Sequence, residues 1–290
     1  MSKVCIFPGQ GAQRVGMGKA LFERYPQLEA EASAILGYSL RRLCLEDPER
    51  QLAQTRYTQP ALYAVNALSY RQYLDDGGAL PAYTAGHSLG EYNALQAAGV
   101  FDFATGLRLV QKRGELMGRV SGGGMLAVIG LHPLRSREVL DEARLHSIDV
   151  ANFNTYEQVV LAGPREALDQ ASPRFEVAGA RTIPLNVSAP FHSRYMADAA
   201  RDFAAFLASF TFQSPRFPVI ANASALPYTA DIHTPLGRQI DQPVRWIESV
   251  EYLLRQGAQD FQEIGVGPVL TPMIQKIRQQ SAFASVAEPA

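Results

Sequence analysis

The feature that most constrains this chain is a glycine-flanked turn between a predicted strand and a predicted helix. Pro81 leads into a short strand at 82–86, which runs directly into Gly-His-Ser-Leu-Gly at 86–90, and a helical pattern begins at once. Small residues two before and two after a serine let the chain bend sharply and expose the hydroxyl. The N-terminus of the next helix directs partial positive charge at that oxygen. The pattern predicts that Ser88 is a nucleophile, with a capping serine in an ordinary turn as the structural alternative.

A second pattern lies farther along the chain, where short strands and helices alternate. We predict strands at 125–131, 148–153, 158–162 and 181–187 and helices at 134–145 and 165–177. The order β-α-β-β-α-β is that of the ferredoxin-like arrangement. We therefore predict an α/β fold in which a ferredoxin-like subdomain, 125–188, is inserted into a large α/β-hydrolase-like body with a parallel sheet, formed by 1–124 and 189–290. A flexible glycine stretch at 122–124 would form the entrance to the subdomain, and 188–190 the exit.

Apolar periodicity and turn residues place further elements in the large body. These are a first strand at 4–7, which ends in Pro-Gly, and helices at 15–25, 27–36, 58–74 and 102–120. We expect Thr58, Gln59 and Pro60 to open the third of these helices.

Charge and cysteine content exclude several classes of protein. Lys and Arg total 27 and Asp and Glu 28, which gives a formal net charge of −1, and no basic run argues for nucleic acid as a partner. No apolar stretch reaches the roughly 18 residues that span a membrane, and the apolar start is too short for a signal peptide. Cys5 and Cys44 are too few for a disulfide framework, and no His/Cys cluster has zinc spacing. We expect a cytoplasmic monomer without a bound metal.

A serine hydroxyl needs a base within hydrogen-bond reach, so the five histidines must be compared. His87 precedes the serine and is expected to point away, while His132 and His146 lie at the edges of the small subdomain and His233 lies in a Pro-rich loop. His192 precedes an apolar-striped helix that Ser193 could cap, so the helix dipole would keep the imidazole neutral. His192 is the candidate base, with a packed loop histidine as the alternative.

An arginine interrupts an apolar helix face. Over 102–120 the apolar stripe consists of Leu109, Leu116 and Val120, with Arg113 between them at helical spacing. Burying a guanidinium without a partner is costly, so either a protein carboxylate or a ligand carboxylate should pair with it. The planar fork of arginine suits bidentate recognition of a carboxylate. Both alternatives stay open on periodicity alone.

Several segments, in order and over nearly the whole chain, resemble the malonyl-CoA:acyl carrier protein transacylases. These segments are Phe7-Pro8-Gly9-Gln10-Gly11-Ala12-Gln13, Thr58-Gln59-Pro60-Ala61, Gly86-His87-Ser88-Leu89-Gly90-Glu91, Arg113-Gly114, Asn152-Phe153-Asn154, Phe191-His192-Ser193, Pro243-Val244-Arg245-Trp246 and Gly265-Val266-Gly267-Pro268. The inserted ferredoxin-like subdomain of that family agrees with the pattern found at 125–188.

The resemblance implies a reaction and the residues that carry it. Ser88 would become malonylated by malonyl-CoA, and His192 would take its proton and return one to the leaving thiol. Arg113 would bind the free carboxylate of the malonyl group. The acceptor would be the phosphopantetheine thiol of an acyl carrier protein, for polyketide or fatty acid synthesis, and the enzyme itself would hold no bound cofactor.

The resemblance also implies supporting residues. The backbone amides of Gln10 and Leu89 would form the oxyanion hole, with glycines beside Gln10 allowing close approach. A backbone carbonyl at Gln239 would orient the histidine. The expected pocket residues are Phe191, Gln59, Asn154 and His87.

Phe191 bears on the pathway, because it resembles the malonyl-selecting Phe-His of polyketide synthase acyltransferases, where many fatty-acid enzymes carry a serine. A bulky ring there leaves little room for an α-methyl branch. Together with the discrete chain, this indicates a stand-alone acyltransferase that serves polyketide synthase modules in trans, as in the disorazole type. Asp241 and Gln242 depart from the family pattern, since an asparagine commonly precedes the next proline.

Other classes of protein remain to be weighed. An editing acyl hydrolase that releases acyl groups from carrier proteins is the main alternative, although Arg113 favours a substrate with a free carboxylate. A carboxylesterase of the α/β-hydrolase type should carry an acid and then a histidine near the C-terminus, and the order here disfavours it. A docking protein without catalysis is disfavoured by the presence of Ser88 and His192.

Overall fold

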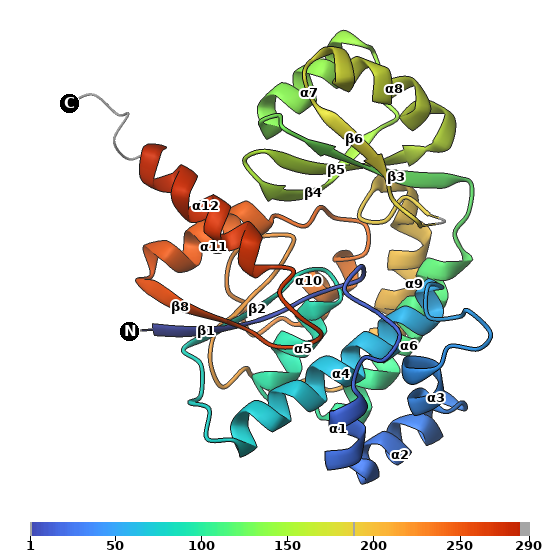
Figure 1. Ribbon diagram of the computed structural model, residues 1–290, viewed down its shortest axis with the longest axis vertical. Coiled ribbons are helices and arrows are strands. Elements are labelled where there is room, and N and C mark those ends of the chain that lie inside the picture. Colours follow the sequence, from blue (N-terminus) through green and yellow to red (C-terminus); the bar gives the residue numbers. More distant parts are fainter. Residues whose placement is uncertain (1, 188, 285–290) are drawn as a thin grey trace.

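A computed structural model describes residues 2–187 and 189–284, which form two sheets of four strands each (Figure 1). The first sheet has the order β7-β2-β1-β8, and its neighbouring strands all pair in parallel. Its strands are β1 (Ser2–Phe7), β2 (Tyr83–Gly86), β7 (Val219–Ile220) and β8 (Ala258–Glu263). The register pairs Phe7 with Gly86, so the carboxyl ends of β1 and β2 lie side by side.

Helices cover both faces of the parallel sheet (Figure 1). The helices of this body are α1 (Lys19–Arg24), α2 (Pro26–Leu36), α3 (Leu40–Leu45), α4 (Thr55–Asp75), α5 (Gly90–Ala97), α6 (Phe103–Arg119), α9 (Ala197–Leu207), α10 (His233–Arg238), α11 (Trp246–Arg255) and α12 (Thr271–Ala284). Side chains alternate along a strand, so Cys5 and Phe7 belong to the core with α4, α5 and α6, while Val4 and Ile6 belong to the core with α11 and α12.

The second sheet is antiparallel, with the order β4-β5-β3-β6. Its elements are β3 (Gly123–Ile129), α7 (Pro133–Glu142), β4 (Asp149–Thr155), β5 (Gln158–Pro164), α8 (Arg165–Val177) and β6 (Arg181–Pro184). This is the predicted β-α-β-β-α-β order, and α7 and α8 cover one face of the sheet (Figure 1). The predicted fold, a parallel α/β body with a small antiparallel sheet inserted, is confirmed.

The glycine stretch before the second sheet is not the flexible entrance that we predicted. Gly123 and Gly124 are the first residues of β3 and pair with Pro164 and Gly163 of β5. A Cβ atom at Gly123 would lie 2.7 Å from the ring of Pro190, so close packing requires glycine there. The division at 124/125 and 188/189 stays a prediction, and Ser188 lies outside the described residues.

One predicted helix start was wrong, and one short helix was missed. The helix expected from Thr58 begins three residues earlier, at Thr55, with Pro60 inside it. The Thr58 hydroxyl donates to the carbonyls of Leu52 and Gln54 and so ties the helix to the preceding loop instead of capping it. The short α3 was not predicted, and its N-cap is Ser39, which accepts from a backbone amide one turn later.

Loop and strand contacts hold the antiparallel sheet against the large body. The Phe153 amide donates to the carbonyl of Val244 (2.9 Å), and the Val244 amide donates to Ala151 (2.8 Å). The Asp149 carboxylate of β4 accepts from the backbone amide and the guanidinium of Arg194. Arg194 lies two residues from His192 in the chain, so its contacts with Asp149 position the second sheet beside that histidine.

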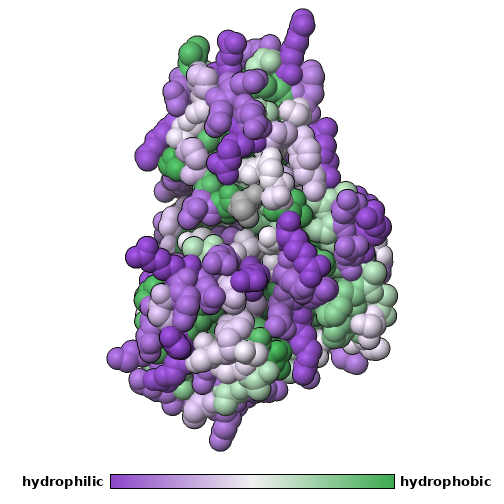
Figure 2. Space-filling model, turned by 90° about the vertical axis from the view of Figure 1, so that its right-hand side faces the viewer, coloured by the Kyte–Doolittle hydropathy of each residue, from purple (hydrophilic) through white to green (hydrophobic). Residues whose placement is uncertain are grey.

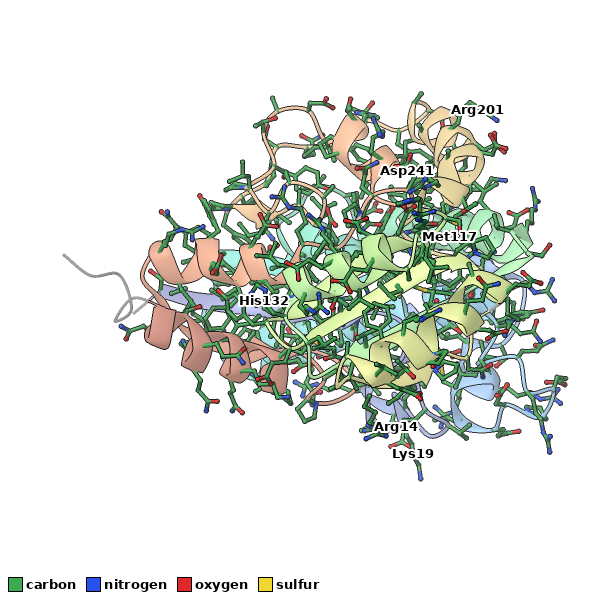
Figure 3. All side chains as sticks on the ribbon, turned by 90° about the horizontal axis from the view of Figure 1, so that it is seen from above. Arg14, Lys19, Met117, His132, Arg201 and Asp241 are labelled. Carbon is green, nitrogen blue, oxygen red and sulfur yellow. The ribbon has the colours of Figure 1, made fainter. Side chains whose placement is uncertain are left out.

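The surface carries both polar and apolar residues. Figure 2 shows hydrophilic side chains over most of the visible face, with smaller hydrophobic patches between them. Arg14 and Lys19 point outward at the edge of the view in Figure 3. In the described part of the chain, no helix has the length and apolar content to cross a membrane.

Candidate active site

Ser88 lies on a tight turn between β2 and α5, at the carboxyl edge of the parallel sheet. Its φ of 50° falls in the left-handed region, which is strained for a serine. A Cβ atom at Gly86 would lie 1.9 Å from the carbonyl carbon of Gly90, and one at Gly90 would lie 2.0 Å from the oxygen of Phe7. The turn therefore needs glycine at both positions, as the sequence pattern suggested.

Asn222, just beyond β7, holds this turn from the neighbouring strand. Its Oδ1 accepts from the Ser88 amide (2.7 Å), and its Nδ2 donates to the Gly86 carbonyl (2.6 Å). One side chain thus satisfies both ends of the strained turn. Asn222 was not predicted, because a two-residue strand leaves no periodic signal in the sequence.

His192 lies opposite Ser88. The Ser88 hydroxyl lies 2.7 Å from Nε2 of His192, and Nδ1 lies 3.0 Å from the Gln239 carbonyl and 3.1 Å from the Gln242 carbonyl. Two carbonyl acceptors require the proton on Nδ1, which leaves Nε2 free to accept the serine proton. Burial, and then the charge of Arg113, lower the pKa of His192 to about 3.

The reason for the neutral imidazole differs from the predicted one. Ser193 does not cap a helix; its hydroxyl donates to the Pro190 carbonyl, and a 3₁₀ turn, Arg194–Met196, separates it from α9. Burial of the ring, and not a helix dipole, disfavours the imidazolium.

Arg113 projects from α6 to the same serine and is only 1% exposed. Its Nη2 donates to Ser88 Oγ (3.1 Å) and to Oε1 of Gln239 (2.8 Å), and its Nη1 donates to Oε1 of Gln59 (2.8 Å). No carboxylate among the described residues forms an ion pair with it, and burial lowers its pKa. The guanidinium is therefore held by neutral groups, which favours the alternative in which an anionic ligand supplies the counter-charge.

The amides of Gln10 and Leu89 lie in adjacent turns. The loop after β1 packs against the serine turn, since a Cβ atom at Gly9 would lie 2.3 Å from the His87 oxygen and 3.5 Å from the Leu89 nitrogen. Within residues 2–187 and 189–284, neither amide donates a hydrogen bond to the protein. Two unpaired N–H groups beside a serine can stabilise an oxyanion.

The four predicted pocket residues lie in three places. Gln59 joins the Arg113 network, and its Nε2 also donates to the sulfur of the buried Met117 (3.3 Å). His87 contacts Asn154, whose Oδ1 lies 2.8 Å from Nε2 of the imidazole. Phe191 is buried next to His192 in the chain.

A cleft of about 560 Å³ reaches His192 from the surface. One wall comes from the antiparallel part of the chain, including Ile148, Val150 and Phe153, and the other comes from the segments around Ser193 and Pro243. The cleft is open to solvent, and its lining includes His192 but neither Ser88 nor Arg113.

Glu91 is a second residue that sequence reasoning missed. It follows the serine turn in α5 and is 1% exposed. Its carboxylate accepts from the Tyr228 hydroxyl, from Nε2 of Gln239 (2.8 Å) and from the Asn222 amide (3.2 Å). Burial raises its pKa to about 7. An acidic residue in a first helical turn is ordinarily exposed, so its sequence position carried no signal of burial.

A serine on a strained turn, a neutral histidine, two free amides and a buried arginine define an acyl-transfer site for an acyl group that bears a carboxylate. Comparison with known proteins agrees with this class. Residues 4–288 match the family described as the acyl transferase domain. The chain belongs to the malonyl-CoA:acyl carrier protein transacylase family, as its relatives also indicate.

Two relatives are 50% identical over 279 residues, which is 95% of this chain. One is a polyketide biosynthesis malonyl CoA-acyl carrier protein transacylase, BaeC, from Bacillus velezensis, of which the match covers 96%. The other is the polyketide biosynthesis protein PksE from Bacillus subtilis, of which the chain spans only 36%.

Solved structures give the same result. A malonyl CoA-acyl carrier protein transacylase from Burkholderia pseudomallei has a TM-score of 0.94 at 45% identity, with both chains fully covered. A malonyl-transacylase in complex with its type II polyketide acyl carrier protein has a TM-score of 0.92 at 40% identity, covering 96% of this chain and 94% of that one.

Proposed function

We propose that this protein transfers a malonyl group from malonyl-CoA to the phosphopantetheine thiol of an acyl carrier protein through a malonyl ester on Ser88. The observation that carries the proposal is the position of Arg113. Its Nη2 lies 3.1 Å from the nucleophilic oxygen, and no carboxylate of the described residues forms a direct ion pair with it. A malonyl carboxylate would supply the missing charge while its thioester carbon faces Ser88.

In the proposed mechanism, His192 acts twice. It takes the Ser88 proton on Nε2 as the serine oxygen attacks the thioester carbonyl, while the amides of Gln10 and Leu89 receive the oxyanion. Collapse of the tetrahedral intermediate breaks the carbon–sulfur bond, and the imidazolium returns its proton to the coenzyme A thiolate. In the second half, His192 takes the proton of the carrier thiol as its sulfur attacks the ester carbonyl. Collapse of this second intermediate forms the carrier thioester, breaks the bond between the acyl carbon and Ser88 Oγ, and returns the proton from His192 to the Ser88 oxygen.

We extend the proposal to the pathway. BaeC and PksE are named for polyketide biosynthesis, and the bulky Phe191 before the histidine suits selection of malonyl groups without an α-methyl branch. This supports a trans-acting acyltransferase that loads carrier domains of polyketide synthase modules, including the disorazole type. We also propose a cytoplasmic monomer, which fits the free thiols of Cys5 and Cys44.

Incubation with malonyl-CoA and a holo acyl carrier protein tests the proposed function against an editing hydrolase. We expect malonyl-carrier to form and to exceed free malonate. Because a water molecule and the carrier thiol compete for the same Ser88 ester, the ratio of these two products distinguishes a transferase from a hydrolase. The same reaction without carrier measures the rate of hydrolysis. Release of free malonate at an equal rate with and without carrier, with no malonyl-carrier formed, would mean that the protein is a hydrolase.

A further inference from the structure

Glu91 is buried behind Gln239 and Asn222 and does not contact the reacting atoms itself. Two of its hydrogen bonds connect it, through these two residues, to Arg113 and Ser88. One path runs from its Oε2 to Nε2 of Gln239 (2.8 Å), and from Oε1 of Gln239 to Arg113 (2.8 Å). The other runs from the same Oε2 to the Asn222 amide (3.2 Å), and from Asn222 to the Ser88 amide (2.7 Å). The two paths meet at one oxygen atom.

We propose that Glu91 is a positioning residue that sets the Arg113 fork and the Ser88 turn together, through the acceptor capacity of its Oε2 and not through its charge. The inference rests on the proposed function of Arg113 and Ser88. It deepens that function, because it names the group that fixes the distance between the carboxylate-binding arginine and the nucleophile.

The orientation of the Gln239 amide is the first step. An amide can rotate to exchange its oxygen and nitrogen, and Arg113 needs the oxygen. Glu91 and the Ser88 carbonyl both accept from Nε2 of Gln239, at 2.8 and 2.7 Å, so they fix the nitrogen on their side. Oε1 must then face Arg113, where it accepts from both Nε and Nη2.

The Asn222 backbone is the second step. Its side chain accepts from the Ser88 amide and so stabilises the strained φ of Ser88. That hydrogen bond forms only while the Asn222 backbone keeps its position. Glu91 anchors the backbone amide of Asn222 directly. Loss of this anchor would let the Ser88 turn relax and move the hydroxyl away from His192.

Both protonation forms of Glu91 can perform this role. The Tyr228 hydroxyl faces Oε1, so a proton on Oε1 would be donated to Tyr228 and leave Oε2 an acceptor. The pKa of about 7 means that both forms are populated near neutral pH. Glutamine mimics the protonated form, with its oxygen toward Gln239 and Asn222 and its amide group toward Tyr228.

The test compares Glu91→Ala with Glu91→Gln by steady-state kinetics with malonyl-CoA and holo acyl carrier protein. We expect Glu91→Ala to raise KM for malonyl-CoA and to lower kcat, with a loss of about 10²-fold in kcat/KM, as small misplacements of reacting groups produce. We expect Glu91→Gln to stay within about tenfold of the wild type. The matched control is Leu253→Ala, which removes a buried side chain of α11 outside the site and should lower the melting temperature without changing KM.

Two outcomes would overturn the inference while the wild type remains active: wild-type kinetics for Glu91→Ala, or a loss in Glu91→Gln equal to that in Glu91→Ala. An inactive wild type would instead refute the proposed function. If Glu91→Ala does not fold, Asn222→Ala replaces it. Asn222→Ala interrupts only the path to Ser88, so it should lower kcat and leave KM for malonyl-CoA near the wild-type value. A rise in KM as large as the fall in kcat would contradict the arrangement of two separate paths.

Discussion

Arg113→Ala should lose malonyl transfer by about 10²–10³-fold in kcat/KM, which corresponds to the loss of a charge-assisted, bidentate contact. Transfer of acetyl groups should stay equal or rise. The reason is that the guanidinium is buried and donates its hydrogen bonds to neutral acceptors, Gln59, Gln239 and Ser88, so a malonyl carboxylate can form the direct ion pair that it lacks. Parallel assays with malonyl-CoA and acetyl-CoA measure the change in selectivity.

Arg113→Lys is the matched control, because it keeps the charge and removes the planar fork. It should retain part of the preference for malonyl-CoA. Thermal unfolding of each variant separates a folding defect from a recognition defect. Equal losses for malonyl-CoA and acetyl-CoA in folded Arg113→Ala would show that the arginine acts on structure alone and not on the substrate carboxylate.

His192→Ala should lower kcat by about 10⁴–10⁶-fold, the range found when a serine nucleophile loses its base. The wild type should also lack an acid limb at the usual histidine pKa. Because burial lowers the pKa of His192 to about 3, the ring stays neutral and able to accept a proton throughout pH 5–8. A pH profile of kcat/KM for the wild type measures this, and a fall centred near pH 6.5 would contradict it.

The pH dependence of the free energy of unfolding provides an independent measurement of the His192 pKa. The unfolded chain protonates His192 below about pH 6.5, whereas the folded protein does so only near 3, so His192 disfavours folding as the pH falls from 6.5 toward 3. His192→Ala should therefore lose less stability than the wild type over that range. Denaturant unfolding at pH 7 and pH 5 tests the difference, and identical losses would indicate an ordinary pKa.

The sequence predicted those parts of the molecule that are encoded locally. The serine turn is specified by residues next to one another, and Gly86 and Gly90 prove to be required by contacts under 2.5 Å. The β-α-β-β-α-β order follows from periodicity within 125–188. Arg113 was found because it interrupts a stripe on one helix.

Features that depend on contacts distant in sequence could not be predicted. Asn222 is 134 residues from Ser88, and the Gln239 side chain is 148 residues from Glu91. The resemblance pointed only to the backbone carbonyl of Gln239, whereas its side chain also accepts from Arg113. Polar residues of this kind acquire their role from tertiary packing, and neither spacing nor propensity reveals their burial.

Intact-protein mass spectrometry after brief exposure to malonyl-CoA, followed by peptide mapping, measures the malonyl ester itself. We predict a single malonyl increment on the peptide that contains Ser88, no increment in Ser88→Ala, and transfer of the label to a holo acyl carrier protein when it is added. Malonylation of Ser88→Ala to the same extent, or a label on a different residue of the wild type, would contradict the assignment of Ser88 as the nucleophile.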